Sequence, residues 1–171
     1  IGSAVALDAI EQERKKGTNV FVETCPHYLT LSYEKQSGYL AKVMPPIRST
    51  SDKEKIWNAI SQKQINTIGT DHVANQLKLK VRDDVWSSLA GFPGIGTLLP
   101  ILLSEGVNKN RINLAQLVEL TSTNAAKIFG MFPQKGSLQK NADADITLID
   151  LKKEQKVSAD FFGAFSDYIV Y

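Results

Sequence analysis

The order of helical and strand patterns along the first part of the chain constrains the fold more than any other feature. Apolar residues recur at helical spacing over residues 4–16 beside a charged face, and Gly17 ends this pattern, as glycine commonly does just past a helix. A short β-branched and aromatic run covers residues 20–25 and is stopped by Pro26, which predicts a buried strand.

The same two patterns recur in the next segment. Residues 51–63 are predicted to form a helix with Ser51 as N-cap, because Glu54 lies three positions on and completes the spacing of a capping box. Residues 65–70 give the next apolar strand pattern. Helix and strand alternating in this way predict an α/β fold with a parallel sheet.

The second half of the chain has a long connection, several helical patterns and a final strand pattern. Residues 72–93 form the connection, and loops of this length in compact domains are often functional. Alternating residues at 145–150 predict a strand near the end. Helices are expected over about residues 95–105, 114–120 and 124–129, with Asn113 and Thr123 as N-caps and Gly130 as the stop.

The apolar run at 65–70 ends in an adjacent carboxylate and imidazole, Asp71 and His72. In a parallel α/β architecture the C-terminal ends of strands face the mouth of the active site, so this is where chemistry is expected. Neighbours along a strand point to opposite faces, so we do not expect Asp71 and His72 to bind the same ion. An alternative without chemistry is that Asp71 only caps the turn after the strand.

Length, charge and cysteine content restrict the class of protein. At 171 residues the chain is one domain or part of a larger one, and its start at Ile1 suggests a piece of a longer protein. A net charge of +2 is too small to indicate nucleic acid or an anionic membrane as a partner. Its one cysteine, Cys25, allows no internal disulfide, so a cytoplasmic location is the default expectation, and no apolar run is long enough to span a bilayer.

Five motifs occur in the order and spacing of one enzyme family. They are VETCPHYL at residues 22–29, MPPIR at 44–48, IGTDH at 68–72, GFPGI at 91–95 and ADADI at 142–146. Together they resemble the hydantoinase, dihydropyrimidinase, dihydroorotase and allantoinase branch of the amidohydrolase superfamily. The resemblance covers nearly the whole chain, but only the second half of the family's sequence.

This resemblance implies a particular place in a larger fold. Members of the branch are (β/α)8 TIM-type barrels with a small β-sandwich. The chain would then be the C-terminal part of the barrel, with residues 20–25 as strand seven and 65–71 as strand eight. Residues 1–134 would form a partial barrel domain, and residues 135–171 would form part of the sandwich domain.

The resemblance also implies metal-dependent hydrolysis of cyclic amides such as hydantoin or dihydropyrimidine rings. Two divalent metal ions, expected to be zinc, would activate water in the full-length parent. Asp71 matches the aspartate that binds one metal and carries a proton to the leaving nitrogen. The other metal ligands would lie before residue 1, so we expect this chain alone to be inactive and not fully metal-loaded. The parent is expected to be a homo-oligomer, either a dimer or a tetramer.

Two loops match segments that contact the cyclic substrate through backbone groups. They are the turn at Met44 and the pair Ala90 and Gly91. Met44 and Gly96 both depart from the residues usual in hydantoinases, so the substrate stays open. Alternatives are a dihydroorotase, an allantoinase, or a non-catalytic dihydropyrimidinase-related scaffold protein.

The remaining polar candidates are predicted to be structural. His27 and Cys25 are expected to be packed side chains, neither a metal ligand nor a nucleophile. Arg48 is expected to form a surface ion pair. Asn141 is a residue that tolerates positive φ in a turn, and Asp143 and Asp145 are expected to be turn and strand-entry residues.

Overall fold

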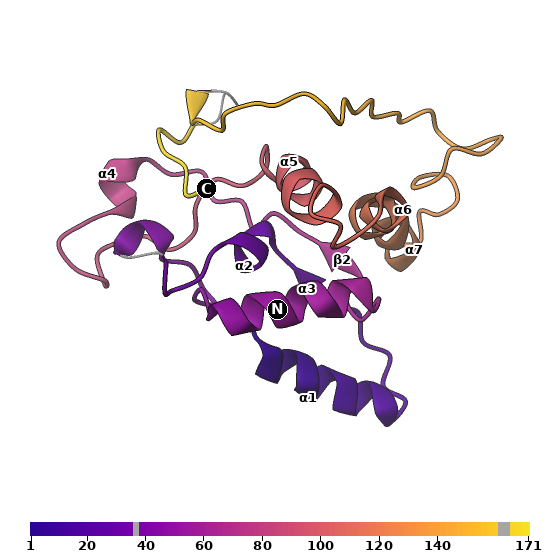
Figure 1. Ribbon diagram of the computed structural model, residues 1–171, viewed down its shortest axis with the longest axis horizontal. Helices are drawn as coiled ribbons and strands as arrows, with labels where there is room; N and C mark the ends of the chain where they lie inside the picture. The colour runs from indigo at the N-terminus through magenta and orange to yellow at the C-terminus, as the bar shows by residue number, and fades with distance from the viewer. Residues whose placement is uncertain (36–37, 161–164) are drawn as a thin grey trace.

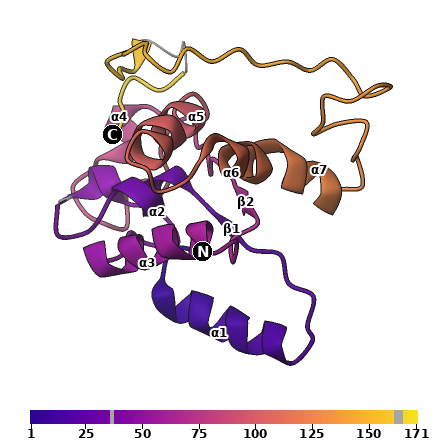
Figure 2. The same ribbon diagram turned by 45° about the vertical axis from the view of Figure 1, so that its right-hand side comes forward.

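The computed structural model describes residues 1–35, 38–160 and 165–171 of the chain. Two parallel strands, β1 (Glu23–Thr24) and β2 (Thr67–Ile68), lie between longer helices, as Figures 1 and 2 show. The helical elements are α1 (Ala4–Lys15), α2 (Pro26–Thr30), the 3-10 turn η1 (Tyr39–Ala41), α3 (Thr50–Ser61), α4 (Leu77–Lys80), α5 (Leu98–Ile101), the π-helical η2 (Leu102–Val107), α6 (Leu114–Val118), the π-helical η3 (Glu119–Thr123) and α7 (Asn124–Ile128). The predicted α/β alternation with a parallel sheet is confirmed.

The two strands are shorter than the predicted ranges 20–25 and 65–70. Glu23 pairs with Thr67 and Thr24 with Ile68, and no other strand lies beside them in the described ranges. A strand is defined by the hydrogen bonds to its neighbours, so the apolar runs gave the position of each strand but not its length.

The main core lies where the sheet meets the helices on its two sides. Figure 2 shows β1 and β2 with α3 on one side and α6 and α7 on the other. Burying each aliphatic side chain here contributes about 1.5–3 kcal/mol. The core includes Leu7, Val22, Leu29, Ile56, Trp57, Ile60, Ile65, Ile68, Leu102, Ile112, Leu117 and Leu120.

Polar contacts hold the N-terminal ends of the two strands together. The guanidinium of Arg14, on α1, donates to the carbonyl of Val20 before β1 and to the carbonyl of Gln64 before β2. It also donates to the side-chain oxygen of Asn66 at 2.9 Å, and that same oxygen accepts the N–H of Val22 at 2.8 Å. These bonds set the relative position of β1 and β2 from the end opposite Asp71.

The N-cap of helix α3 lies two residues before the predicted one. Ser49, not Ser51, caps the helix, because its hydroxyl oxygen accepts the N–H of Asp52 at 3.0 Å. Ser51 lies inside the first turn and is exposed. The predicted capping box of Ser51 and Glu54 is therefore wrong, although the helix itself is confirmed.

Helix α2 was not predicted. Pro26 ends the strand pattern as expected, but it also occupies the first turn of a helix, where its missing N–H costs nothing. The helix buries His27, Tyr28 and Leu29. The segment that follows β1 is therefore helical at its start.

The predicted helices 114–120 and 124–129 are parts of one continuous helical segment. Asn113 caps it through a full capping box with Gln116, as predicted for this N-cap. Thr123 is not an N-cap: its backbone is helical, and its hydroxyl donates to the carbonyl of Gly136 at 2.9 Å. Gly130 has φ +69°, which confirms it as the stop.

Two further predictions in the second half need correction. The helix expected at about 95–105 begins at Leu98 and passes into the π-helical turn η2. The connection 72–93 contains the short helix α4. No helix of the described residues is long and apolar enough to cross a membrane.

The predicted strand at 145–150 is absent. These residues are exposed and have no regular structure, because no described segment lies alongside to complete a hydrogen-bond ladder. Figure 1 shows this part of the chain crossing the top of the molecule as an extended trace. Asn141 has φ +71°, as its turn position predicted. Within the predicted sandwich range 135–171, residues 161–164 lie outside the described part.

Candidate active site

Asp71 lies just beyond the C-terminal end of β2, where the sequence placed it. Its side chain is exposed, and among the described residues no group donates a hydrogen bond to its carboxylate. Its φ of +47° is left-handed, a conformation that aspartate tolerates better than most residues. Because β2 ends at Ile68, the alternation of side chains along a strand does not apply to Asp71 and His72, and that argument for separating them was wrong.

Three buried or partly buried groups lie within electrostatic reach of the Asp71 carboxylate. Burial, followed by the charges of Asp71 and Glu23, raises the pKa of the Cys25 thiol to about 12. Burial, followed by Cys25 and Asp71, raises the pKa of the Tyr28 phenol to about 12. Burial also raises the pKa of Tyr171, with Asp71 among the smaller causes. All three groups are therefore neutral at pH 7, and Cys25 is a protonated thiol, as its predicted structural role requires.

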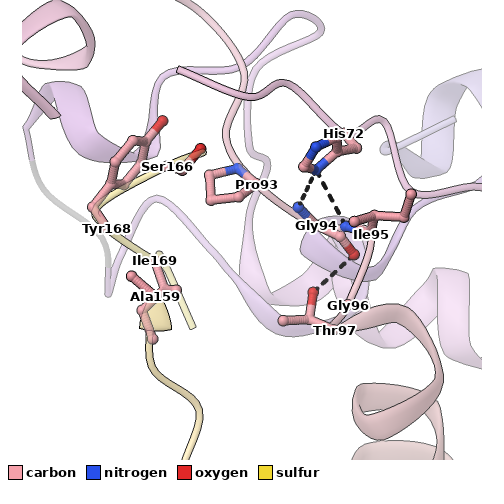
Figure 3. A pocket seen from close by; sticks show the side chains of 10 residues that line it. All are labelled: His72, Pro93, Gly94, Ile95, Gly96, Thr97, Ala159, Ser166, Tyr168 and Ile169. Carbon is pink, nitrogen blue, oxygen red and sulfur yellow. Dashed lines mark hydrogen bonds between the residues drawn. The ribbon is translucent and has the colours of Figure 1, made fainter. Parts of the chain in front are cut away.

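His72 organises the next loop through its ring and its backbone. Its Nδ1 accepts the backbone N–H of Gly94 at 3.0 Å and that of Ile95 at 3.3 Å, as Figure 3 shows. An accepting Nδ1 means that the ring proton is on Nε2. His72 also forms a parallel bridge with Phe92. These contacts make His72 a residue that shapes the loop 91–97.

His27 is completely buried between aromatic rings. It lies 4.2 Å from the Tyr28 ring and 5.2 Å from the Phe92 ring, measured between centroids. Neither ring nitrogen has a hydrogen-bond partner among the described residues. Burial lowers the pKa of His27 to about 4. The surroundings are those of a packed side chain, as the sequence indicated.

The two loops expected to contact substrate lie on the same side of the molecule as the end of β2. Met44 is exposed at 69%, and the carbonyl of Pro45 accepts the hydroxyl of Tyr28 at 2.7 Å. Gly91 is buried with φ +84°, and its N–H donates to the carbonyl of Lys42 at 3.0 Å. The two loops are therefore in direct backbone contact.

Gly91 could not be replaced by a larger residue without a change in the loop. A Cβ at this position would lie 2.5 Å from Cγ2 of Val73, in addition to the strain of its positive φ. Gly94 is also close to the strand end, because a Cβ there would lie 3.0 Å from the carbonyl oxygen of Thr70. The loop 91–97 thus packs directly on the segment that carries Asp71.

A small cavity lies beside His72 and not at Asp71. Figure 3 shows it between the loop 93–97 and the C-terminal segment. Two of its lining residues are joined by a hydrogen bond, because the hydroxyl of Thr97 donates to the carbonyl of Gly94 at 3.0 Å. The lining is mostly apolar, and Asp71 is not part of it.

The remaining predicted surface residues have simple contacts. Arg48 is exposed and has no salt-bridge partner in the described part of the chain, so the predicted ion pair is not formed. Asp143 and Asp145 both bind the ammonium of Lys135, at 2.8 and 2.5 Å. They are not a second acid pair, in agreement with their predicted structural role.

The sequence did not reveal three residues that shape the site. Tyr28 supports the Met44 loop, and Tyr168 donates to Asn75 at 2.5 Å and to the carbonyl of Gly91 at 3.5 Å. Lys80 is fully buried beneath both loops. A single sequence offers no signal for Lys80, since lysine is normally a surface residue.

Asp71 has the properties of one metal ligand but has no companion ligands in the part of the chain that the structure describes. An exposed carboxylate at a strand end is a suitable oxygen donor for a divalent cation. Within residues 1–35, 38–160 and 165–171, however, no group of three His, Cys, Asp or Glu side chains could hold a metal ion. The residues present therefore fit a single position of a metal site.

Residues 9–171 match the model of the amidohydrolase family. A D-hydantoinase of Geobacillus stearothermophilus is 40% identical over 176 residues, which cover 98% of this chain and 37% of that protein. An L-hydantoinase of Paenarthrobacter aurescens is 36% identical over 166 residues, which cover 95% of this chain and 36% of that protein. The chain thus spans little more than a third of the length of these relatives.

Solved structures give the same result. The crystal structure of a dihydropyrimidinase from Brevibacillus agri matches with a TM-score of 0.92 at 38% identity. The match covers 98% of this chain and 38% of that one. Two parallel strands and their helices therefore have the backbone arrangement found in that protein.

Proposed function

Because this chain belongs to the amidohydrolase family, we propose that it forms the Asp71-bearing part of an enzyme that hydrolyses C–N bonds in cyclic amides. The names of its relatives support a hydantoin or dihydropyrimidine ring as the substrate. The exposed Asp71 carboxylate beside the C-terminal end of β2 is the observation that carries this proposal.

In the proposed reaction Asp71 is both a metal ligand and a proton carrier. Two divalent metal ions, which we propose to be zinc, would activate water and polarise the carbonyl oxygen of the amide when bound. One carboxylate oxygen of Asp71 accepts a proton as the water oxygen attacks the carbonyl carbon. Asp71 then returns this proton to the ring nitrogen as the C–N bond breaks, so that no charge is left on the departing amine.

The neutral groups around Asp71 suit this role. Cys25 and Tyr28 keep their protons, since their pKa values are both raised to about 12. Neither can compete with Asp71 as a base near pH 7. We therefore assign proton transfer to Asp71, and we propose that Cys25 and Tyr28 only line the site.

The Met44 loop and the Ala90–Gly91 loop are proposed to meet the ring through backbone groups. Met44 is exposed, and its loop is bound to the second loop through Gly91 and Lys42. A backbone contact does not depend on the side chain at position 44. Assays of hydrolysis with hydantoin, dihydrouracil, dihydroorotate and allantoin identify which ring is the substrate.

The larger setting is also part of the proposal. We propose that residues 1–134 complete a TIM-type barrel in the whole protein and that 135–171 join a small β-sandwich. The whole protein is proposed to be a cytoplasmic dimer or tetramer, with the other metal ligands outside this chain. The TM-score of 0.92 to a dihydropyrimidinase supports the barrel part of this proposal.

The test is Asp71→Asn in the whole protein, which keeps the shape of the side chain and removes its charge. We expect kcat to fall by about a thousandfold or more with the cyclic amide that is turned over best, because both the ligand and the proton carrier are lost. Metal content, measured by mass spectrometry, should fall in the same variant.

Asp8→Asn is the matched control, since Asp8 is an exposed aspartate on α1. Its activity and metal content should equal those of the wild type. Wild-type protein that binds metal but hydrolyses none of the four rings would contradict the proposal and favour the non-catalytic scaffold.

A further inference from the structure

Lys80 is a buried cation without a carboxylate partner. Its side chain is 0% exposed at the end of α4, and no salt bridge involves it in the described residues. Its ammonium lies 5.4 Å from the centroid of the Phe92 ring. Burial, followed by the nearby Lys42 ammonium, lowers the pKa of Lys80 to about 8. Placing an ammonium here is costly, so its contacts should be informative.

The ammonium of Lys80 bonds to two carbonyls from different loops. One is the carbonyl of Lys42, and the other is that of Leu89 at 3.1 Å. Lys42 stands two residues before Met44, and Leu89 directly precedes Ala90. Lys80 thus binds a residue next to each of the two loops, the Met44 loop and the Ala90–Gly91 loop, that are proposed to contact the substrate.

A second set of bonds strengthens this connection. The Gly91 N–H donates to the same Lys42 carbonyl that Lys80 binds, at 3.0 Å. The Lys42 ammonium, which is on the solvent side, donates to the carbonyls of Val85 and Ser88, the latter at 2.5 Å. Hydrogen bonds from a charged donor are about twice as strong as neutral ones. The segment 85–91 is therefore bound to Lys42 twice, through the backbone carbonyl of Lys42 and through its side-chain ammonium.

We propose that Lys80 is a positioning residue that holds the Met44 loop and the Ala90–Gly91 loop at a fixed separation for binding of the cyclic amide. This inference rests on the proposed function, because it assigns the purpose of the two loops. Lys80 does not touch the reacting atoms. Its loss should weaken substrate binding while proton transfer at Asp71 continues.

The test compares Lys80→Met, Lys80→Arg and Lys78→Met in the whole protein. Methionine keeps most of the apolar stem and removes the cation, whereas arginine keeps a donor for both carbonyls. Lys78 is the matched control, since it lies on the same helix α4 and is exposed. Hydrogen exchange by mass spectrometry over residues 42–45 and 89–92 is measured beside kcat and KM.

For Lys80→Met we expect exchange in both loops to be faster by about tenfold or more, because both charge-assisted bonds of Lys80 are lost, and exchange in α3 to stay unchanged. KM should rise by about tenfold and kcat should change by less than about threefold. Lys80→Arg should restore both readouts in part, and Lys78→Met should match the wild type. Unchanged loop exchange, or a fall in kcat with KM unchanged, would overturn the proposal.

Two further measurements keep the result clear. If Lys80→Met does not fold, exchange is measured in the Asp71→Asn variant with and without hydantoin. Protection of both loops together supports the proposal, and protection of only one overturns it. If the wild-type protein hydrolyses no cyclic amide, the proposed function fails, while loop exchange in Lys80→Met still tests whether Lys80 joins the loops.

Discussion

His27 makes stability depend on pH, because it is buried as a neutral imidazole. Its pKa is lowered to about 4, against 6.5 for the ordinary side chain. Above pH 6.5 the imidazole is neutral in both the folded and the unfolded chain. As the pH falls from 6.5 toward 4, only the unfolded chain takes up the proton, so the free energy of unfolding decreases by up to about 3 kcal/mol.

His27→Leu should remove this acid sensitivity, because leucine carries no titrating group and is of similar size. Urea unfolding at pH 7 and pH 4.5 measures the change in each protein. The wild type should lose more stability between the two pH values than the variant does. Parallel losses in both proteins would show that His27 is not the group responsible.

Among single residues, Asp71 could be located from sequence and Lys80 could not. Asp71 follows an apolar strand pattern directly, and strand ends are where parallel sheets place functional groups. Lys80 ends the stretch Leu77–Lys80, in which leucine and lysine alternate and nothing marks one lysine as buried. Its environment depends on carbonyls from residues 42 and 89, which only the folded chain brings together.

The N-cap of α3 gives a prediction at the scale of one element. Ser49→Ala should lower the free energy of unfolding by about 1 kcal/mol, because the N–H of Asp52 loses its acceptor. Ser51→Ala is the control, since Ser51 is exposed in the first turn and makes no cap. Urea midpoints of the two variants measure the difference. Equal midpoints would mean that Ser49 does not act as the cap.

The helices and strands were predictable in position but less so in extent. Local patterns located α1, α3 and both strands, because these depend on apolar spacing. The length of each strand depends on neighbours along the sheet, and the predicted strand at 145–150 has no described neighbour at all. The π-helical turn η3 joins two predicted helices through backbone bonds that side-chain spacing does not encode.

At the scale of the whole molecule, we propose that the chain supplies one ligand, Asp71, to a metal site that needs several. We expect the isolated 171-residue chain to bind fewer than two zinc ions and to leave hydantoin and dihydropyrimidine rings intact. Metal content after dialysis, measured by mass spectrometry, checks this. Two zinc ions per isolated chain would contradict it, since the described residues hold no cluster of three ligand groups.

The bonds of Arg14 have a consequence for how this protein could change over time. They fix β1 and β2 at one end, whereas Asp71 and the loops 42–45 and 89–92 lie at the other. Substitutions or insertions in those loops leave the Arg14 bonds intact, so the register of the strands does not depend on them. If the two loops bind the ring as proposed, exchanging one of them between relatives that act on different rings should change specificity while the Arg14 end stays unaltered.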